Sequence, residues 1–482
     1  MSLTVEREIA RYSYIMIVAL ITSSLFNYLY QVVMGVLLPK HEFGVLGVAL
    51  SIMFIASVLT QNTFSWSGTR RLSNHLSKDI FRTVIVGNTS LALIASVAII
   101  LLSLKTSYLL PCIIVSAIVL ITALNASCVS LLRAIKKFKS LAIANVIFSI
   151  LKLILAIFLV LIGWGALGAL LSMLIATLVV AAYLVYESLR IELDKSKGSF
   201  GMITETFLVS ITFIGITFVI NSSIIFMRWI SGSDVLAGDY NAALTIARGP
   251  FFITAALITV LFPYVSSPND RREFFAFQSI KYMILLVFPI CLSMAVDPKT
   301  WLNLFFGQKY AEGAEILRVL SIGIGLTSLA FVISSNLIAF EKLKVPAVSL
   351  FIASMAQIAV IFLLKGDPAF VSALSVVISS AIAVILLVAY YARRFYFKCS
   401  VKYVIKIAVA YSVLSAVFLL IHINGRLLSL AEIVISFIIY FLLLSILGLF
   451  DEKDVKVIFS PLPRQSAEWL KRIVSKLNSI GR

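Results

Sequence analysis

Charged residues are scarce in this chain of 482 residues, and acidic residues are scarcer than basic ones. Asp, Glu, Lys and Arg together make up 13% of the residues, whereas 61% are hydrophobic, and the mean hydropathy is +1.07. A water-soluble protein of this length could not bury that much apolar surface and still cover itself with polar groups. The composition therefore excludes a soluble globular protein and predicts a chain surrounded by lipid.

Cysteine and histidine are also rare, with four and three residues, respectively. No metal-ligand spacing relates the cysteines, which are Cys112, Cys128, Cys291 and Cys399. The histidines form no cluster either, so we expect the cysteines to act as small apolar residues in or beside helices. The sequence predicts neither a metal site nor a cofactor.

Long apolar segments account for most of the chain. Each is long enough to cross a bilayer, which takes about 20 residues in a helix. The sequence thus predicts an all-α integral membrane protein with 14 transmembrane helices. The segments are residues 12–38, 43–66, 83–104, 109–132, 141–163, 166–188, 206–230, 237–264, 280–297, 314–338, 346–364, 369–391, 402–422 and 428–449.

The basic residues orient these helices. If the N-terminus is cytoplasmic, 30 Lys and Arg residues fall on the cytoplasmic side and only six in the outer loops. This bias follows the positive-inside rule, so the net charge of +18 reflects topology and contact with anionic lipids, and not nucleic-acid binding. We predict a multi-pass protein of the cytoplasmic membrane with both termini inside. The six outer residues are Lys40, Lys105, Lys299, Lys309, Lys365 and Arg426.

Two short similarities indicate an internal duplication. GVLGVALSI (44–52) matches GDYNAALTI (238–246) at an offset of 194, which also pairs Asn27 with Asn221. AIKKFKS (134–140) matches AFEKLKV (339–345) at an offset of 205, which pairs Lys152 with Gln357. Six helices per copy make the repeat parallel. We predict lobes at residues 1–200 and 201–398, helices 13 and 14 at 399–450, and a cytoplasmic tail with an amphipathic helix at 451–482.

Four basic residues fall inside predicted helices: Lys152, Arg228, Arg248 and Arg318. A charge in the membrane costs roughly 2.5–3.5 kcal/mol on insertion scales and therefore suggests a functional site. Two of the four end polar stripes at helical spacing, Asn145–Ser149–Lys152 and Asn241–Thr245–Arg248, and Arg228 follows Asn221 by seven residues. Arg318 has an alternative partner in Glu315 or Glu312. A cavity lined by such cations, with few acids nearby, favours an anionic substrate.

Several segments resemble the Wzx-type polysaccharide or lipid-linked oligosaccharide flippases of the multidrug/oligosaccharidyl-lipid/polysaccharide exporter superfamily. They are LFNYLY (25–30), EFGVLGVALS (42–51), RRLS (70–73), AGDYNAALTIA (237–247), LFP (261–263), LFFGQKY (304–310) and FEKLK (340–344). The resemblance implies two six-helix lobes in a V shape with helices 13 and 14 beside them. It also implies that a polyprenyl-(di)phosphate-linked oligosaccharide moves to the outer leaflet by alternating access through a cationic central cavity.

From the residues and this resemblance together, the candidate substrate-binding residues are Lys152, Arg248, Arg228, Arg318, Asn145, Asn241, Asn221, Asn27 and Gln357. We expect a monomer that is not an enzyme and that contacts anionic lipids, with a glycosyltransferase as a further partner. Two alternatives stay open. One is an antiporter of drugs or organic cations from the same superfamily, and the other is a membrane glycan polymerase or ligase. The second would need a catalytic acid pair or a large outer loop, and the sequence offers neither.

Overall fold

The computed structural model describes residues 19, 22–104, 106–194, 203–267, 271–394, 401–420 and 425–449. Within these ranges the chain is helical and contains no strand. Twelve of these helices are long and apolar enough to cross a membrane. Many large apolar side chains point outward, including Leu102, Leu189 and Leu420, each at least 80% exposed. The protein is therefore a multi-pass membrane protein whose apolar outer surface suits contact with hydrocarbon.

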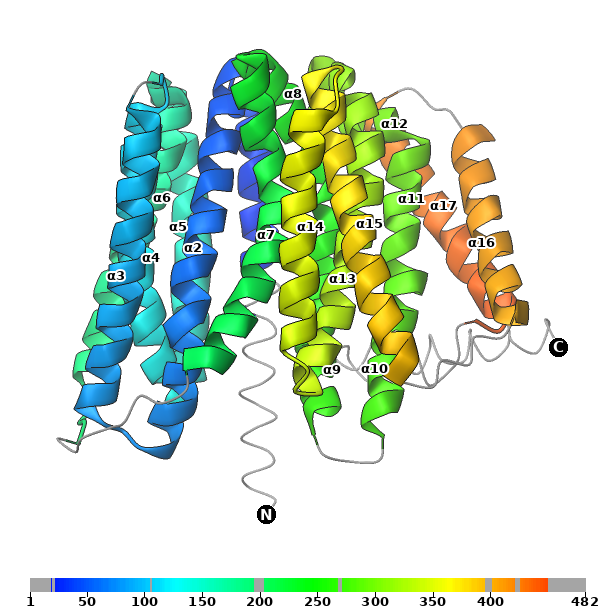
Figure 1. Cartoon of the computed structure of the whole chain (residues 1–482). Coiled ribbons are helices and arrows are strands. Elements are labelled where there is room, and N and C mark those ends of the chain that lie inside the picture. Colours follow the sequence, from blue (N-terminus) through cyan, green and yellow to red (C-terminus); the bar gives the residue numbers. More distant parts are fainter. Residues whose placement is uncertain are drawn as a thin grey trace.

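The first half of the chain forms one group of helices, on the left in Figure 1. A helix over residues 22–37 precedes it. α5 and α6 are joined by a short π-helical turn, Val160–Trp164. Gly163 in this turn has a φ angle of +93°, and Gly165, the first residue of α6, has one of +53°. The helices are α2 (Lys40–Asn74), α3 (Lys78–Ser103), α4 (Leu109–Ala134), α5 (Phe138–Leu159) and α6 (Gly165–Leu189).

The second half is more interrupted. α8 and α9 divide one predicted segment at Arg248, where the sequence Gly249–Pro250 begins the next helix. α10 and α11 are joined by a π-helical turn, Met283–Val287, and α12 and α13 by a 3₁₀ turn, Gly307–Gly313. The helices are α7 (Ile203–Ser231), α8 (Asp234–Ala247), α9 (Gly249–Ser266), α10 (Arg272–Tyr282), α11 (Phe288–Val296), α12 (Pro298–Phe306), α13 (Ala314–Ala339), α14 (Lys344–Leu363) and α15 (Pro368–Arg394).

Two further helices, α16 (Val401–Leu420) and α17 (Arg426–Ile446), lie beside the second half, on the right in Figure 1. All 14 predicted segments overlap helices of the described chain. The number of membrane crossings stays a prediction, because α5 and α6 count as one continuous helix of 52 residues by length and composition. The predicted lobe boundaries also stay predictions, and the tail at 451–482 lies outside the described residues.

One helix, α12, was not expected from the apolar pattern. Its residues fall in the predicted outer loop between 297 and 314. The carboxylate of Asp297 accepts a hydrogen bond from the Thr300 amide at 3.2 Å, and Pro298 occupies the first turn. An Asp at the N-cap followed by Pro is a favourable helix start even without a long apolar run. Local capping therefore explains an element that hydropathy alone missed.

Two turns on the same side of the molecule share one backbone conformation. After α4, Lys136 has a φ angle of +61°, and after α13, Glu341 has the same φ angle. The Lys136 amide donates to the Arg133 carbonyl at 3.0 Å, and the Glu341 amide donates to the Ile338 carbonyl at 2.9 Å. Left-handed residues other than Gly are uncommon at helix ends. Their recurrence at the offset of 205 supports the predicted duplication at the level of local structure.

The two matching glycines of the 194 offset face each other where α2 packs against α8. A Cβ atom on Gly44 would lie 2.1 Å from the Asp234 carbonyl oxygen, and one on Gly238 would lie 2.1 Å from the Lys40 carbonyl oxygen. Three residues further along α2, a Cβ atom on Gly47 would overlap the Asn241 side chain. The backbones of the two helices can approach this closely only because these positions lack side chains.

Gly238→Ala tests this contact. The added methyl group meets backbone atoms of α2, so the helices must separate, and the expected loss is about 1–3 kcal/mol of stability. We expect a lower melting temperature in detergent than for the wild type. The matched control is Gly249→Ala, where the nearest atom to the new Cβ is 3.9 Å away. Equal melting temperatures for the two variants would contradict the close contact.

Candidate functional site

A cavity of about 470 Å³ lies inside the first group of helices. Its walls come from the helix over residues 22–37 and from α2, α4, α5 and α6, and among the described residues only Phe252 of α9 lines it from the second half. The cavity reaches from Lys152, within α5, to Arg133 in the last turn of α4. The sequence predicted a cavity between the two halves, whereas this one belongs almost entirely to the first half.

Lys152 is buried in the wall of this cavity and is only 4% exposed. Its ammonium group donates a hydrogen bond of 2.5 Å to Asn27 Oδ1. It also lies 4.4 Å from the ring centroid of Tyr30 and 5.2 Å from that of Phe148. Among the described residues it forms no ion pair with a carboxylate. The positive charge is therefore held by one amide and two aromatic faces, and is not neutralised by an acid.

The other charged residue in the cavity wall is Arg133. Among the described residues, no Asp or Glu lines the cavity, so both charged residues of this part of the wall are positive. Arg133 was not among the predicted site residues, because the predicted helix ends at residue 132 and leaves Arg133 in the following loop. The end of α4 could have indicated it. Lys136 adopts the left-handed conformation that follows this helix, so Arg133, three residues earlier, lies in the last helical turn and not in a loop.

Uncharged polar groups make up much of the remaining wall. Asn27 and Asn145, both predicted site residues, line the cavity, and so do Asn125, Gln61 and Thr177. Asn125 Oδ1 is buried and has no hydrogen-bond partner in the described chain. Buried amide oxygens are seldom left without a donor unless a ligand or water supplies one. The wall can thus offer hydrogen bonds to hydroxyl groups as well as positive charge to an anion.

Arg248 is buried between the two halves, at the break between α8 and α9, and is 6% exposed. Its guanidinium donates to Asn221 Oδ1 of α7 at 2.7 Å and to Ser51 Oγ of α2 at 3.4 Å. Its Cζ atom lies 5.9 Å from the ring centroid of Phe54, which lines the cavity. Arg248 therefore contacts Phe54, a residue of the cavity wall, but does not line the cavity itself.

Arg228 and Arg318 are engaged in ion pairs. Arg228 Nε donates to the Asp234 carboxylate, to which Tyr108, the residue before α4, donates as well. Arg318 forms two hydrogen bonds to Glu315, of 2.8 and 2.9 Å, and both side chains are largely exposed. The second arrangement is the pairing that the sequence left open as an alternative for Arg318. Neither arginine lines the cavity.

The last two predicted residues hold helices together. Asn241 Nδ2 donates to the Phe43 carbonyl at 2.9 Å and so links α8 to α2. Gln357 Nε2 donates to the Val219 carbonyl at 3.1 Å and links α14 to α7. Neither residue lines the cavity described above. The structure thus brings Lys152, Asn27 and Asn145 together and leaves the other six predicted residues outside this site.

Comparison with protein families assigns the chain to a family. The model of a family described as polysaccharide biosynthesis protein matches residues 9–268, which is more than half of the chain. The chain belongs to this polysaccharide biosynthesis family. None of the curated proteins matches it significantly.

Solved structures share the fold of this polysaccharide biosynthesis family member at low identity. The lipid II flippase MurJ, in an inward-closed conformation, has a TM-score of 0.65 and 17% identity, covering 89% of this chain and 98% of its own. An inward-facing MATE multidrug resistance transporter of the MOP superfamily has a TM-score of 0.58 and 15% identity, covering 77% and 95%. A MOP superfamily transporter from Pyrococcus furiosus also has 0.58, with 16% identity, covering 80% and 95%. These similarities show a MOP-type transporter fold.

The variant Arg318→Gln tests whether the ion-paired Arg318 is independent of the cavity. The Arg318–Glu315 pair is exposed, so its loss should change stability by no more than about 1 kcal/mol. Because Arg318 does not line the cavity, we expect transport near the wild-type rate, together with a nearly unchanged melting temperature. A folded Arg318→Gln protein without transport activity would show that Arg318 contacts the substrate in another conformation.

Proposed function

We propose that this protein is a flippase. Its substrate would be a polyprenyl-(di)phosphate-linked oligosaccharide, moved from the cytoplasmic to the outer leaflet by alternating access. The observation that carries the proposal is the cavity inside the first half, whose charged lining residues, Lys152 and Arg133, are both basic. Membership of the polysaccharide biosynthesis family and the MOP-type fold support it.

The two basic residues suit phosphate groups. An ammonium has three donors, and Lys152 uses one of them on Asn27, which leaves others for an anion. Arg133 can present two parallel N–H groups to one phosphate. A diphosphate would compensate the buried charge of Lys152, which no carboxylate of the described chain neutralises. A ligand with two anionic groups thus fits this wall better than a neutral or cationic one.

The neutral polar groups suit the sugar. Asn145, Asn125 and Gln61 can each donate and accept hydrogen bonds, as sugar hydroxyls require. Asn125 Oδ1 in particular lacks a donor. The polyprenyl tail needs no such site, because it can stay in the surrounding hydrocarbon while the head group crosses. The cavity would therefore hold only the polar part of the substrate.

An organic cation is a poorer fit. A cationic substrate would have to approach Lys152 and Arg133 with no carboxylate in the cavity wall to offset the repulsion. The same lack of a paired acid argues against glycosyl transfer or hydrolysis in this cavity, since both reactions need positioned carboxylates. The charge of the cavity wall therefore favours the flippase over both alternatives.

Translocation in proteoliposomes tests the proposal. A fluorescent polyprenyl-diphosphate oligosaccharide is placed in one leaflet, and its transfer to the other is followed by quenching. We expect Lys152→Met and Arg133→Met each to lower the rate by about tenfold or more, because each removes charge-assisted hydrogen bonds to phosphate. Lys139→Met is the matched control, since Lys139 is exposed on α5 and does not line the cavity.

Two results would contradict the proposal. One is normal glycolipid transfer by a folded Lys152→Met and Arg133→Met double variant, which would remove the cavity from the substrate path. The other is transport of a cationic dye by the wild type without any transfer of the glycolipid, which would assign the protein to organic-cation export. Melting temperatures of all variants show whether a lost rate reflects lost folding.

A further inference from the structure

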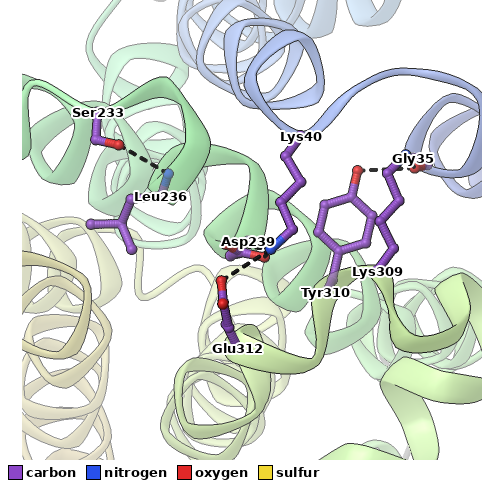
Figure 2. A network of polar contacts seen from close by, with 8 residues as sticks. All are labelled: Gly35, Lys40, Ser233, Leu236, Asp239, Lys309, Tyr310 and Glu312. Atoms are coloured by element: carbon purple, nitrogen blue, oxygen red, sulfur yellow. Dashed lines mark hydrogen bonds and ion pairs between the residues drawn. The ribbon is translucent and has the colours of Figure 1, made fainter.

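The segment LFFGQKY (304–310) plays no part in the anion site. This segment comprises the end of α12 and the start of the 3₁₀ turn Gly307–Gly313. We call this turn, residues 307–313, the strap. The strap belongs to the second half of the chain, but Figure 2 shows its residues Lys309, Tyr310 and Glu312 beside Gly35 and Lys40 of the first half. These contacts lie at the end of the molecule that the sequence predicts to be the outer one.

The strap binds the C-terminal end of the helix over residues 22–37. Lys309 Nζ donates to the carbonyl oxygens of Gly35 at 3.0 Å and Val36 at 3.1 Å, and also to that of Leu38. Tyr310 Oη donates to the same Gly35 carbonyl at 2.9 Å. The last carbonyls of a helix lack intrahelical donors and carry partial negative charge. A lysine is thus well placed to hold this helix end.

An ion-pair cluster adjoins these hydrogen bonds, as Figure 2 shows. Lys40, the first residue of α2, lies 3.0 Å from Asp239 of α8 and 3.0 Å from Glu312 of the strap. The Glu312 side chain is 79% exposed, so its share of the cluster is weak, whereas Asp239 is buried. Lys40 thus joins the first half to two separate elements of the second half.

Apolar packing completes the attachment. A Cβ atom on Gly35 would lie 2.4 Å from the Phe306 ring, so this ring occupies the space that the glycine leaves open. The ring centroid of Phe43 in α2 lies 6.0 Å from that of Phe306 and 5.6 Å from that of Tyr310. Gly307, with a φ angle of +66°, turns the chain between Phe306 and Tyr310. One contact between the halves therefore uses four residues of LFFGQKY, namely Phe306, Gly307, Lys309 and Tyr310.

We propose that the strap is a latch that keeps the outer end closed and that must detach before this end can open. Its attachment consists of hydrogen bonds to carbonyl oxygens, one exposed ion pair and packing of aromatic rings. Water can replace the hydrogen bonds when the halves separate. The Gly44–Gly238 contact lies at the same end, so both contacts must break in an outward-open state. The proposal does not depend on which substrate crosses the membrane.

Distances between two spin labels, measured by double electron–electron resonance in lipid nanodiscs, test the latch. Spin labels are attached at Ser107→Cys and Lys365→Cys, two exposed loop positions of the two halves at the predicted outer end, after the native cysteines are replaced. In the double variant Lys309→Met with Tyr310→Phe, we expect about a tenfold rise in the ratio of molecules open at the outer end to closed ones. The reason is that the hydrogen bonds from Lys309 and Tyr310 to the backbone carbonyls are lost. Labels at Ser73→Cys and Lys342→Cys, at the opposite end, should move closer together.

Three controls make the outcome decisive. Lys299→Met removes an exposed lysine of α12 and should keep the wild-type distances. Lys309→Arg retains a cationic donor and should restore most of the closed population. Tyr310→Phe alone keeps the ring and serves if the double variant does not fold. Distances equal to those of Lys299→Met, in a folded double variant or in folded Tyr310→Phe, would overturn the latch.

Discussion

The close backbone contact between α2 and α8 determines how the two halves of this protein meet. Gly44 and Gly238 leave no side chain between the helices, so neighbouring residues on both helices come within hydrogen-bonding reach. Asn241 reaches the Phe43 carbonyl, Lys40 reaches Asp239, and Arg248 reaches Ser51. A larger residue at either glycine would displace all three contacts at once. The register of this crossing therefore sets these three polar contacts between the halves.

Basic residues fall into two groups according to their partners. Arg228, Arg318 and Lys40 each contact a carboxylate, and their role is to join helices or to pair at the surface. Lys152 instead is held by an amide and two aromatic rings, and Arg133 lines the same cavity without a carboxylate in the wall. Insertion of a charge into a membrane is costly, so a buried cation without an acid suggests that another anion compensates it during function. Arg248, which donates to Asn221 and Ser51, also lacks a carboxylate partner but does not line the cavity, so the proposed site takes only Lys152 and Arg133.

Positions that correspond in the predicted repeat carry different chemistry in the two halves. Asn27 and Asn221 correspond at the offset of 194, and each accepts a hydrogen bond from a cation, Lys152 and Arg248, respectively. The position that corresponds to Lys152 at the offset of 205 is Gln357, which donates to a backbone carbonyl of α7. A neutral amide at this position removes the charge that makes the first half a cationic cavity. The two corresponding positions thus differ in charge, and of the two only Lys152 lines the cavity described here.

The sequence alone predicted the helices, the membrane environment, the two matching turns and the candidate site residues Lys152, Asn27 and Asn145, which line one cavity. These features follow from hydropathy, helical period and local turn geometry, which depend on residues close together in the chain. Only the tertiary structure decided that the described cavity lies within the first half, that Arg133 lines it, and that Tyr108 and Arg228 share Asp234. Likewise, nothing near LFFGQKY in the chain indicates that it binds the end of a helix more than 260 residues earlier. Such contacts join residues that are distant in sequence, so their partners are set by how whole helices pack.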